Sequence, residues 1–176
     1  LKEGQEVGLL FRGNGPLGSV YAEASFEGNV RGYCPHAHYQ APQPEDMLNL
    51  GKALGNGTLS VSRHQPFQRQ PFHGTVEIVS GEIGDDVAHY LAQSHQIRSV
   101  VSLGVNLDGN GDVKAAGGVL IEVMPGVEES VVELLQKNHD QSKIQVSKSL
   151  AEGLSLEQIL QPFLKGIPFT EIPHEH

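Results

Sequence analysis

The spacing of apolar residues changes along this chain, and that change is the strongest constraint on its fold. From Val20 to Phe26, apolar and polar side chains alternate with the period of two that is typical of a β-strand. Residues 27–29 predict a turn and residues 30–34 predict a second strand, so we expect a hairpin over residues 19–34. The same criteria predict strands at residues 7–11, 57–63, 74–80, 99–107 and 113–124, and a loop over residues 35–46.

After Gly81 the spacing lengthens to the three- and four-residue steps of an amphipathic helix. Ile83, Val87 and Tyr90 follow these steps and predict a helix over residues 82–95. Further helices are predicted at residues 128–139, 142–151 and 155–165, the last with Ser155 as its N-cap. Strands first and helices last predict an α+β fold, with a strand-rich core of mainly antiparallel sheets packed with helices and followed by a helical carboxy-terminal arm.

Charge and cysteine content narrow the class of function. Twelve basic residues face 21 acidic ones, and this net charge of -9 argues against the cationic surface that nucleic-acid binding needs. The one cysteine, Cys34, permits no internal disulfide and agrees with a reducing cytosol. The sequence has no apolar run near the ~20 residues of a membrane-spanning helix and opens with no signal-peptide pattern. We expect a cytoplasmic protein whose ends here, Leu1 and His176, are cuts.

Gly13, Gly15 and Gly18 have the spacing of a dinucleotide-binding fingerprint. That motif binds a pyrophosphate at the amino terminus of a helix that begins directly after the glycines. Here the next residues alternate as a strand, so a glycine-rich hairpin corner is the favoured interpretation and cofactor binding is the alternative.

Asp108, Asn110 and Asp112 have the one-three-five spacing of a calcium-binding loop. The sixth position is Val113, where glycine is required, and the twelfth is Val119, where glutamate is required. With predicted strands on both sides, residues 108–112 are interpreted as a turn, and no calcium site is expected.

Cys34, His36 and His38 offer three zinc ligands from one loop. Alternate residues converge poorly on one ion and no fourth ligand is suitably spaced, so we predict no metal-binding residue in this chain. His174 and His176 are assigned to a frayed tail. The remaining scattered histidines are interpreted as solvated side chains: His64, His73, His89 and His139.

Catalytic patterns are missing from the sequence as well. It contains no Gly-x-Ser-x-Gly elbow and no cysteine–histidine pair with supporting context. Glu82, Asp85 and Asp86 are the densest carboxylates, but they sit at a predicted helix start, where the macrodipole favours each by about 0.3–1 kcal/mol. We predict no catalytic or cofactor-binding residue and conclude that the chain is not an enzyme.

Seven short segments, in their order and spacing over residues 7–166, resemble the heat-shock protein 33 family of bacterial redox-regulated chaperones. They cover residues 13–18, 30–33, 54–61, 74–86, 90–94, 115–121 and 124–126. The resemblance implies an ATP-independent holdase that binds unfolding proteins under oxidative and heat stress. It also implies a homodimer that exchanges its helical arm, and a carboxy-terminal zinc domain with four cysteines. That domain binds zinc when reduced and forms disulfides when oxidised, after which the neighbouring linker unfolds and exposes binding surface.

On this resemblance, residues 1–126 are the sheet-rich core, residues 127–166 the subunit-exchanging arm, and residues 167–176 the start of the linker to the zinc domain. The sequence departs from the family pattern in three ways. It lacks the first strand and helices of the core and the four zinc-binding cysteines, and it has His95 where the family commonly has an acidic residue.

The predicted arm is rich in apolar side chains, and we expect only sparse connections from it to the sheet. Since burying one such side chain contributes about 1.5–3 kcal/mol, the arm is expected to need a partner surface, either a twin subunit or an unfolded client. Two other functions stay open: a small-molecule-binding enzyme that uses the glycine-rich corners as a ligand cradle, and a purely structural interaction domain. The apolar residues are Leu134, Leu135, Ile144, Val146, Leu150, Leu154, Ile159, Leu160 and Phe163.

Overall fold

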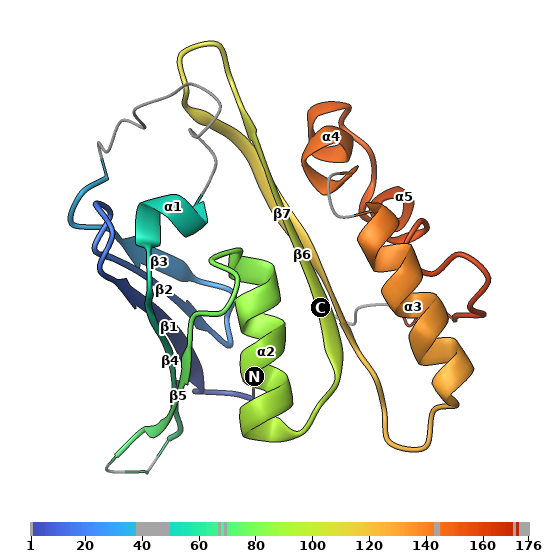
Figure 1. The fold of residues 1–176 in the computed structure, drawn as a ribbon, viewed down its shortest axis with the longest axis horizontal. Coiled ribbons are helices and arrows are strands. Elements are labelled where there is room, and N and C mark those ends of the chain that lie inside the picture. Colours follow the sequence, from blue (N-terminus) through green and yellow to red (C-terminus); the bar gives the residue numbers. More distant parts are fainter. Residues whose placement is uncertain are drawn as a thin grey trace. The chain divides into compact units, whose positions relative to one another are not determined.

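The computed structural model describes residues 2–37, 50–66, 68, 70–142, 145–170 and 172 of the chain (Figure 1). The chain divides into two compact units, residues 1–96 and 97–176. Each unit combines an antiparallel sheet with helices, which confirms the predicted α+β fold. The predicted division at residue 126 concerns subunit exchange and stays a prediction.

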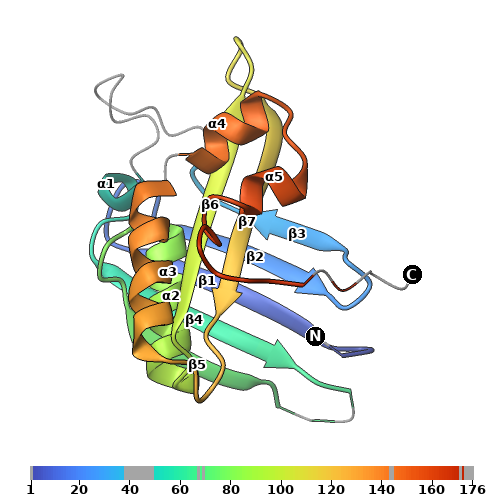
Figure 2. The ribbon, with the colours of Figure 1, turned by 90° about the vertical axis from the view of Figure 1, so that its right-hand side faces the viewer.

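The first unit is built on a five-stranded sheet. Its strands are β1 (Glu6–Gly13), β2 (Ser19–Ser25), β3 (Val30–Tyr33), β4 (Gly57–His64) and β5 (Phe72–Glu77). They lie in the order β3-β2-β1-β4-β5, with every neighbouring pair antiparallel, as Figure 2 shows. The period-two segments therefore form the strands that the sequence predicts, including the hairpin over residues 19–34.

Two helices complete the first unit. The predicted helix over residues 82–95 is confirmed as α2 (Ile83–His95), whereas α1 (Leu50–Leu54) was not predicted. Phe11 of β1, Leu59 of β4, Leu54 of α1 and Tyr90 of α2 meet in one buried cluster. The apolar side of the sheet is thus covered by residues from both helices.

The second unit is a hairpin of β6 (Ser99–Leu107) and β7 (Val113–Glu122) with three helices. These are α3 (Glu129–Ser142), α4 (Gln145–Ala151) and α5 (Leu156–Leu160). The last is shorter than the predicted helix over residues 155–165, because Pro162 has no amide hydrogen to continue the helix and the chain proceeds in turns. Among the described residues, no helix combines the length and apolarity needed to cross a membrane.

The expectation of sparse connections between the arm and the sheet is wrong. Helix α4 packs on both β6 and β7, because glycines let it approach closely. A Cβ placed on Gly104 would lie 2.6 Å from the Ser147 nitrogen, and the Ser147 hydroxyl accepts a hydrogen bond from the Val105 amide at 3.1 Å. Ile144 lies outside the described residues. The other eight apolar residues of the predicted arm are buried or half-buried.

Candidate functional site

The glycine-rich segment at residues 13–18 packs against a second one at residues 54–57. The Gly15 amide donates to the Leu54 carbonyl at 2.7 Å, and the Leu17 amide donates to the Ala53 carbonyl at 2.9 Å. A Cβ on Gly13 would collide with the Leu54 carbonyl oxygen. Because β2 rather than a helix follows the glycines, the predicted hairpin corner is confirmed. The amides that a ligand cradle would need are bonded to the protein itself.

The carboxylate of Asp86 organises the approach to α2. It is fully buried, and it accepts hydrogen bonds from the amides of Val79 at 2.8 Å, Ser80 at 3.0 Å and Gly81 at 2.9 Å. Strand β5 was predicted to continue to residue 80, but it ends at Glu77 because these amides bind the carboxylate instead of a neighbouring strand. The sequence predicted a structural rather than a catalytic role for the carboxylates at the start of this helix, and Asp86 has such a role.

Residues 108–112 form the hairpin turn that the sequence predicts. One carboxylate oxygen of Asp108 accepts hydrogen bonds from the amides of Asn110 at 2.8 Å and Asp112 at 3.0 Å. Side-chain bonding of this kind is typical of an aspartate that stabilises a tight turn. The strands β6 and β7 leave the turn on either side.

Of the three candidate zinc ligands in the first loop, Cys34 and His36 are described and His38 is not. Cys34 is a free, half-buried thiol that packs against the core of the first unit. Within the part of the chain that the structure describes, no three His, Cys, Asp or Glu side chains gather as a metal site would require. Cys34 and His36, the two described candidates, therefore belong to no such group among the described residues.

The scattered histidines occupy three kinds of environment. His64 and His73 are exposed, as predicted, and His89 is half-buried. The interpretation of His139 as a solvated side chain is wrong, because only 3% of it is exposed and its Nε2 lies 3.3 Å from the Val101 carbonyl oxygen. The helical period placed His139 on the inner side of α3, beside Leu135, and that signal was available in the sequence. His174 and His176 lie outside the described residues.

His95, where the family pattern commonly has an acidic residue, is the last residue of α2. Its Nε2 lies 3.4 Å from the hydroxyl of Tyr90, and the two rings meet edge to face at 5.5 Å between centroids. The hydroxyl of a buried tyrosine needs a polar partner. His95 supplies that partner, a role that the sequence did not reveal.

A polar network crosses β2 and β3 on the first unit. The Tyr21 hydroxyl donates a short hydrogen bond to Glu23, and Arg31 pairs with Glu23 at 2.5 Å. The hydrogen bond from Tyr21, assisted by Arg31, holds the pKa of Glu23 below its usual value. The same hydrogen bond to Glu23 raises the pKa of Tyr21. Residues 21 and 23 share one side of β2, and Arg31 stands opposite Glu23 in the register. The network links β2 to the edge strand β3 through side chains.

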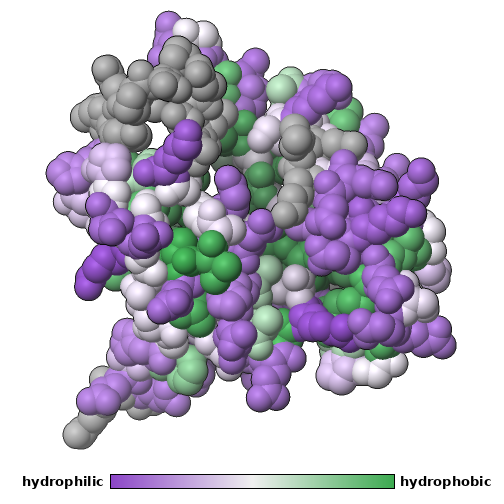
Figure 3. Space-filling view, viewed as in Figure 1, coloured by the Kyte–Doolittle hydropathy of each residue, from purple (hydrophilic) through white to green (hydrophobic). Residues whose placement is uncertain are grey.

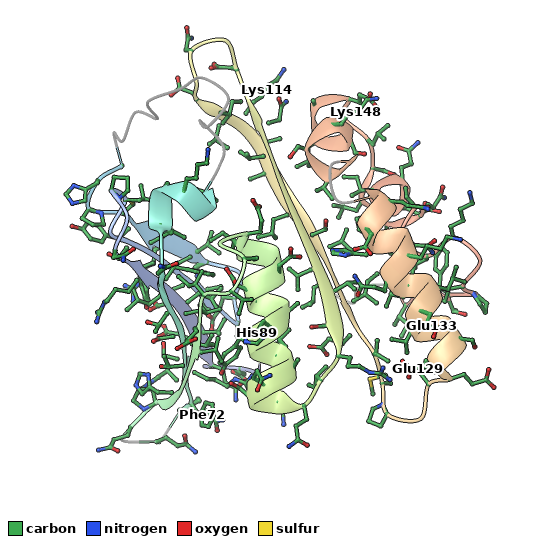
Figure 4. All side chains as sticks on the ribbon, in the orientation of Figure 1. Phe72, His89, Lys114, Glu129, Glu133 and Lys148 are labelled. Carbon is green, nitrogen blue, oxygen red and sulfur yellow. The ribbon has the colours of Figure 1, made fainter. Side chains whose placement is uncertain are left out.

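A second ion pair lies on the outside of the second unit. Arg98, just before β6, donates three hydrogen bonds of 2.8–3.0 Å to the carboxylate of Glu129 at the start of α3. Glu133 follows one turn later on the same helix (Figure 4). Both partners of the ion pair are more than half exposed, so it contributes at most about 1 kcal/mol and carries no chemistry.

Exposed apolar side chains are the feature with the clearest binding potential. On the hairpin of the second unit, Leu103 of β6 is 50% exposed and Leu120 of β7 is 56% exposed. The register pairs Leu103 with Gly118 and Val101 with Leu120, so both leucines lie on the same face of the hairpin. We call Leu103 and Leu120 the hairpin leucines.

Figure 3 shows apolar patches between hydrophilic stretches of the visible surface. Apolar patches of this kind are typical of interaction sites.

Comparisons with known proteins agree with these features. The family model described as Hsp33 protein matches residues 1–175. The 33 kDa chaperonin of Synechococcus sp. (strain JA-3-3Ab) is 43% identical over 169 residues, which cover 95% of this chain and 52% of the relative. A 33 kDa chaperonin of Thermus thermophilus is 41% identical over 166 residues, which cover 94% of this chain and 48% of the relative. The chain thus spans about half the length of the curated relatives it matches.

The fold leads to the same family. The crystal structure of the 33 kDa chaperonin, a heat shock protein 33 homologue, from Thermotoga maritima superposes with a TM-score of 0.80 at 34% identity. The match covers 93% of this chain and 56% of that one. These relatives are named for a chaperone and not for an enzyme. From the match of the family model over nearly every residue, we conclude that this chain belongs to the Hsp33 family.

Proposed function

We propose that the protein containing this chain is a chaperone that holds unfolding proteins without ATP. The match to the Hsp33 family over residues 1–175 is the observation that carries this proposal. The exposed hairpin leucines support it, because apolar surface is what an unfolded polypeptide recognises. The glycine corners do not support the rival enzyme, since their amides already bind backbone carbonyls of the same chain.

The test is the aggregation of a thermally unfolding client enzyme, followed by light scattering. We expect the natural full-length protein to suppress scattering in proportion to its molar ratio to the client, in the absence of nucleotide. An equal mass of serum albumin controls for nonspecific crowding. A folded, stable preparation that leaves the scattering unchanged at a tenfold molar excess would contradict the proposal.

We further propose that the protein forms a homodimer by exchanging the arm of residues 127–166. The family match supports this proposal, and the contacts of α4 with β6 and β7 are of a kind that an exchanged arm would make with the partner's sheet. The exposed turn with Gly126 at φ 88° between β7 and α3 supplies a hinge. Light scattering coupled to size-exclusion chromatography tests the dimer. Exchange itself is tested by mixing labelled and unlabelled protein and measuring the rate at which subunits mix.

We propose that the holding activity is regulated by a zinc-binding domain encoded outside residues 1–176. We also propose that the protein is cytoplasmic. Residues 1–176 contain one cysteine, so the four cysteines of the family pattern are expected elsewhere in the protein. The expected result is one zinc ion per full-length subunit, released on treatment with peroxide as disulfides form and holding activity rises. A full-length protein that binds no zinc, or whose activity ignores peroxide, would contradict this part of the proposal.

A further inference from the structure

Three asparagines of the chain are each followed by glycine: Asn14, Asn56 and Asn110. In such a pair the backbone nitrogen of the glycine can attack Cγ, the side-chain carbonyl carbon of the asparagine, because glycine has no Cβ to hinder the approach. The product is a five-membered succinimide ring. Its closure requires the asparagine side chain and the following peptide to rotate toward each other, so the structure around each pair decides whether the pair reacts.

The pair of Asn14 and Gly15 is held at both reacting groups. The Gly15 amide, which supplies the attacking nitrogen, donates to the Leu54 carbonyl at 2.7 Å. The side-chain oxygen of Asn14, on the carbon to be attacked, accepts from the Asn56 amide at 3.0 Å. A Cβ on Gly15 would lie 2.5 Å from the Ala53 carbonyl oxygen, so packed backbone opposes the rotation. Ring closure here would break both hydrogen bonds and move that backbone.

The pair of Asn56 and Gly57 is held by the five-stranded sheet. Strand β4 begins at Gly57 and lies between β1 and β5. The Asn56 carbonyl accepts from the Asn14 amide at 3.0 Å, and the Gly57 carbonyl accepts from the Ile78 amide at 2.9 Å. A Cβ on Gly57 would collide with the Arg12 carbonyl oxygen. The peptide that must rotate is therefore fixed between neighbouring segments of backbone.

The pair of Asn110 and Gly111 stands in an open turn. It lies at the tip of the β6–β7 hairpin, which projects beyond α4 in Figures 1 and 2. Asn110 is exposed, and its side chain has no hydrogen-bond partner among the residues that the structure describes. A Cβ on Gly109 or on Gly111 meets no described atom within 4 Å. The Gly111 amide donates to the Asp108 carbonyl at 3.1 Å, and the attack must release this bond.

Asp108 and Gly109, in the same turn, could close the same type of ring. The carboxylate is a poor target, because its negative charge lowers the reactivity of Cγ toward a nucleophile. One of its oxygens is also bound by the amides of Asn110 at 2.8 Å and Asp112 at 3.0 Å. The turn therefore favours ring closure at Asn110.

We propose that Asn110 is a deamidation site and that the fold protects Asn14 and Asn56. The Gly111 nitrogen loses its proton to solvent and bonds to Cγ of Asn110. The bond from Cγ to Nδ2 breaks, and Nδ2 takes up a proton and leaves as ammonia. Water then opens the ring. Opening at the main-chain carbonyl gives isoaspartate, in which the chain continues through the side chain, and opening at the other carbonyl gives aspartate.

Both products change the tip of the hairpin. Each adds a negative charge between Asp108 and Asp112, which are both exposed, and like charges in one turn repel. Isoaspartate also inserts a methylene group into the main chain, which moves the Gly111 amide away from its partner carbonyl. We expect the turn to open, while the pairing of β6 with β7 from Asn106 and Ala115 onward persists.

The test incubates the natural full-length protein at mildly alkaline pH, folded and, in parallel, unfolded in guanidinium chloride. Mass spectrometry of peptides locates each conversion of an amide to an acid, and transfer of a labelled methyl group by an isoaspartate methyltransferase measures isoaspartate. In the folded protein, deamidation is expected to be at least about tenfold faster at Asn110 than at Asn14 or Asn56, because ring closure at those sites breaks additional hydrogen bonds. In guanidinium chloride the three sites should react at similar rates.

Asn110→Gln is the matched control. It keeps an amide in the turn, but the ring to be closed has six members and forms far more slowly, so this variant is expected to gain no isoaspartate in the same time. Similar rates at all three sites in the folded protein would overturn the proposal, as would isoaspartate at Asp108 in place of Asn110. An Asn110 that reacts in guanidinium chloride but not in the folded protein would also contradict it.

Discussion

Replacing Asp86 is the sharpest test of how the first unit is held together. This carboxylate is fully buried and accepts three backbone amides, from Val79, Ser80 and Gly81, at 2.8–3.0 Å. These bonds fix the turn between β5 and α2. Asp86→Ala leaves all three donors without the carboxylate. Asp86→Asn keeps an oxygen for Val79 and Ser80 but turns an NH₂ group toward the Gly81 amide.

The magnitude follows from the number of bonds. A hydrogen bond to a charged group contributes about 1.5–3 kcal/mol, and neighbouring contributions are not additive. Water reaches Val79 and Ser80, which are exposed, so part of the loss is recovered. We expect Asp86→Ala to lower the free energy of unfolding by about 3–5 kcal/mol. Asp86→Asn should cost about half as much, because it loses one bond of three and the negative charge that strengthens the other two.

The assay is urea unfolding followed by circular dichroism, with the slope of the transition checked for each variant. Glu82→Gln is the control, since this exposed residue is the N-cap of α2 but makes no side-chain capping bond, and it should change stability by less than about 0.5 kcal/mol. If Asp86→Ala unfolds at the same urea concentration as Glu82→Gln, the three bonds do not stabilise the fold and the reasoning fails.

Three further predictions concern single positions. Gln96 ends α2 at φ 57°, so Gln96→Gly should raise the free energy of unfolding by about 0.5–1 kcal/mol in the same urea assay, and a loss would contradict the left-handed cap. The Tyr21 hydrogen bond lowers the pKa of Glu23 in the folded state. The ionised Glu23 therefore stabilises the protein at pH values above the pKa that Glu23 has in the unfolded chain. This contribution is lost as the pH falls through the pKa of Glu23 in the folded protein. The urea midpoint of the wild type should therefore fall more steeply below about pH 4.5 than that of Glu23→Gln, and parallel curves would refute the network. Gly13→Ala should lower the free energy of unfolding by about 1–3 kcal/mol, measured by thermal unfolding, because its Cβ would collide with the Leu54 carbonyl. Gly28→Ala has open space around it and should lose only the cost of its positive φ. Equal losses would contradict the close approach of residues 13–18 to residues 54–57.

Much of the first unit was predictable because its strands have one apolar side and one polar side. The alternation around β2 and the helical spacing in α2 each reflect burial against a single core, and both elements form where expected. Helix α1 was missed because five residues are too few to show a helical period. Its stability comes from Ala53 and Leu54, which are buried in that core.

The buried carboxylate of Asp86 and the buried amide of Asn138 could not be predicted from the sequence. The carboxylate of Asp86 binds amides five to seven residues before it, and the amide of Asn138 binds carbonyls 25 and 27 residues after it. No pattern of residue types in the sequence identifies such partners. The arm was misjudged for a related reason. No sequence pattern indicated that Gly104 and Gly117 let α4 lie close to the hairpin and cover residues that we expected to need a partner.

The most direct test of the account compares the full-length wild type with a variant that carries Leu103→Ser and Leu120→Ser. Both are assayed for suppression of client aggregation without ATP, with Leu156→Ser, at an 83% exposed position, as the control. We expect strong suppression by the wild type and the control, and at least a severalfold higher protein requirement for the double variant. Equal suppression by all three would show that the hairpin leucines hold no client, and absence of suppression by the folded wild type would contradict the chaperone function itself.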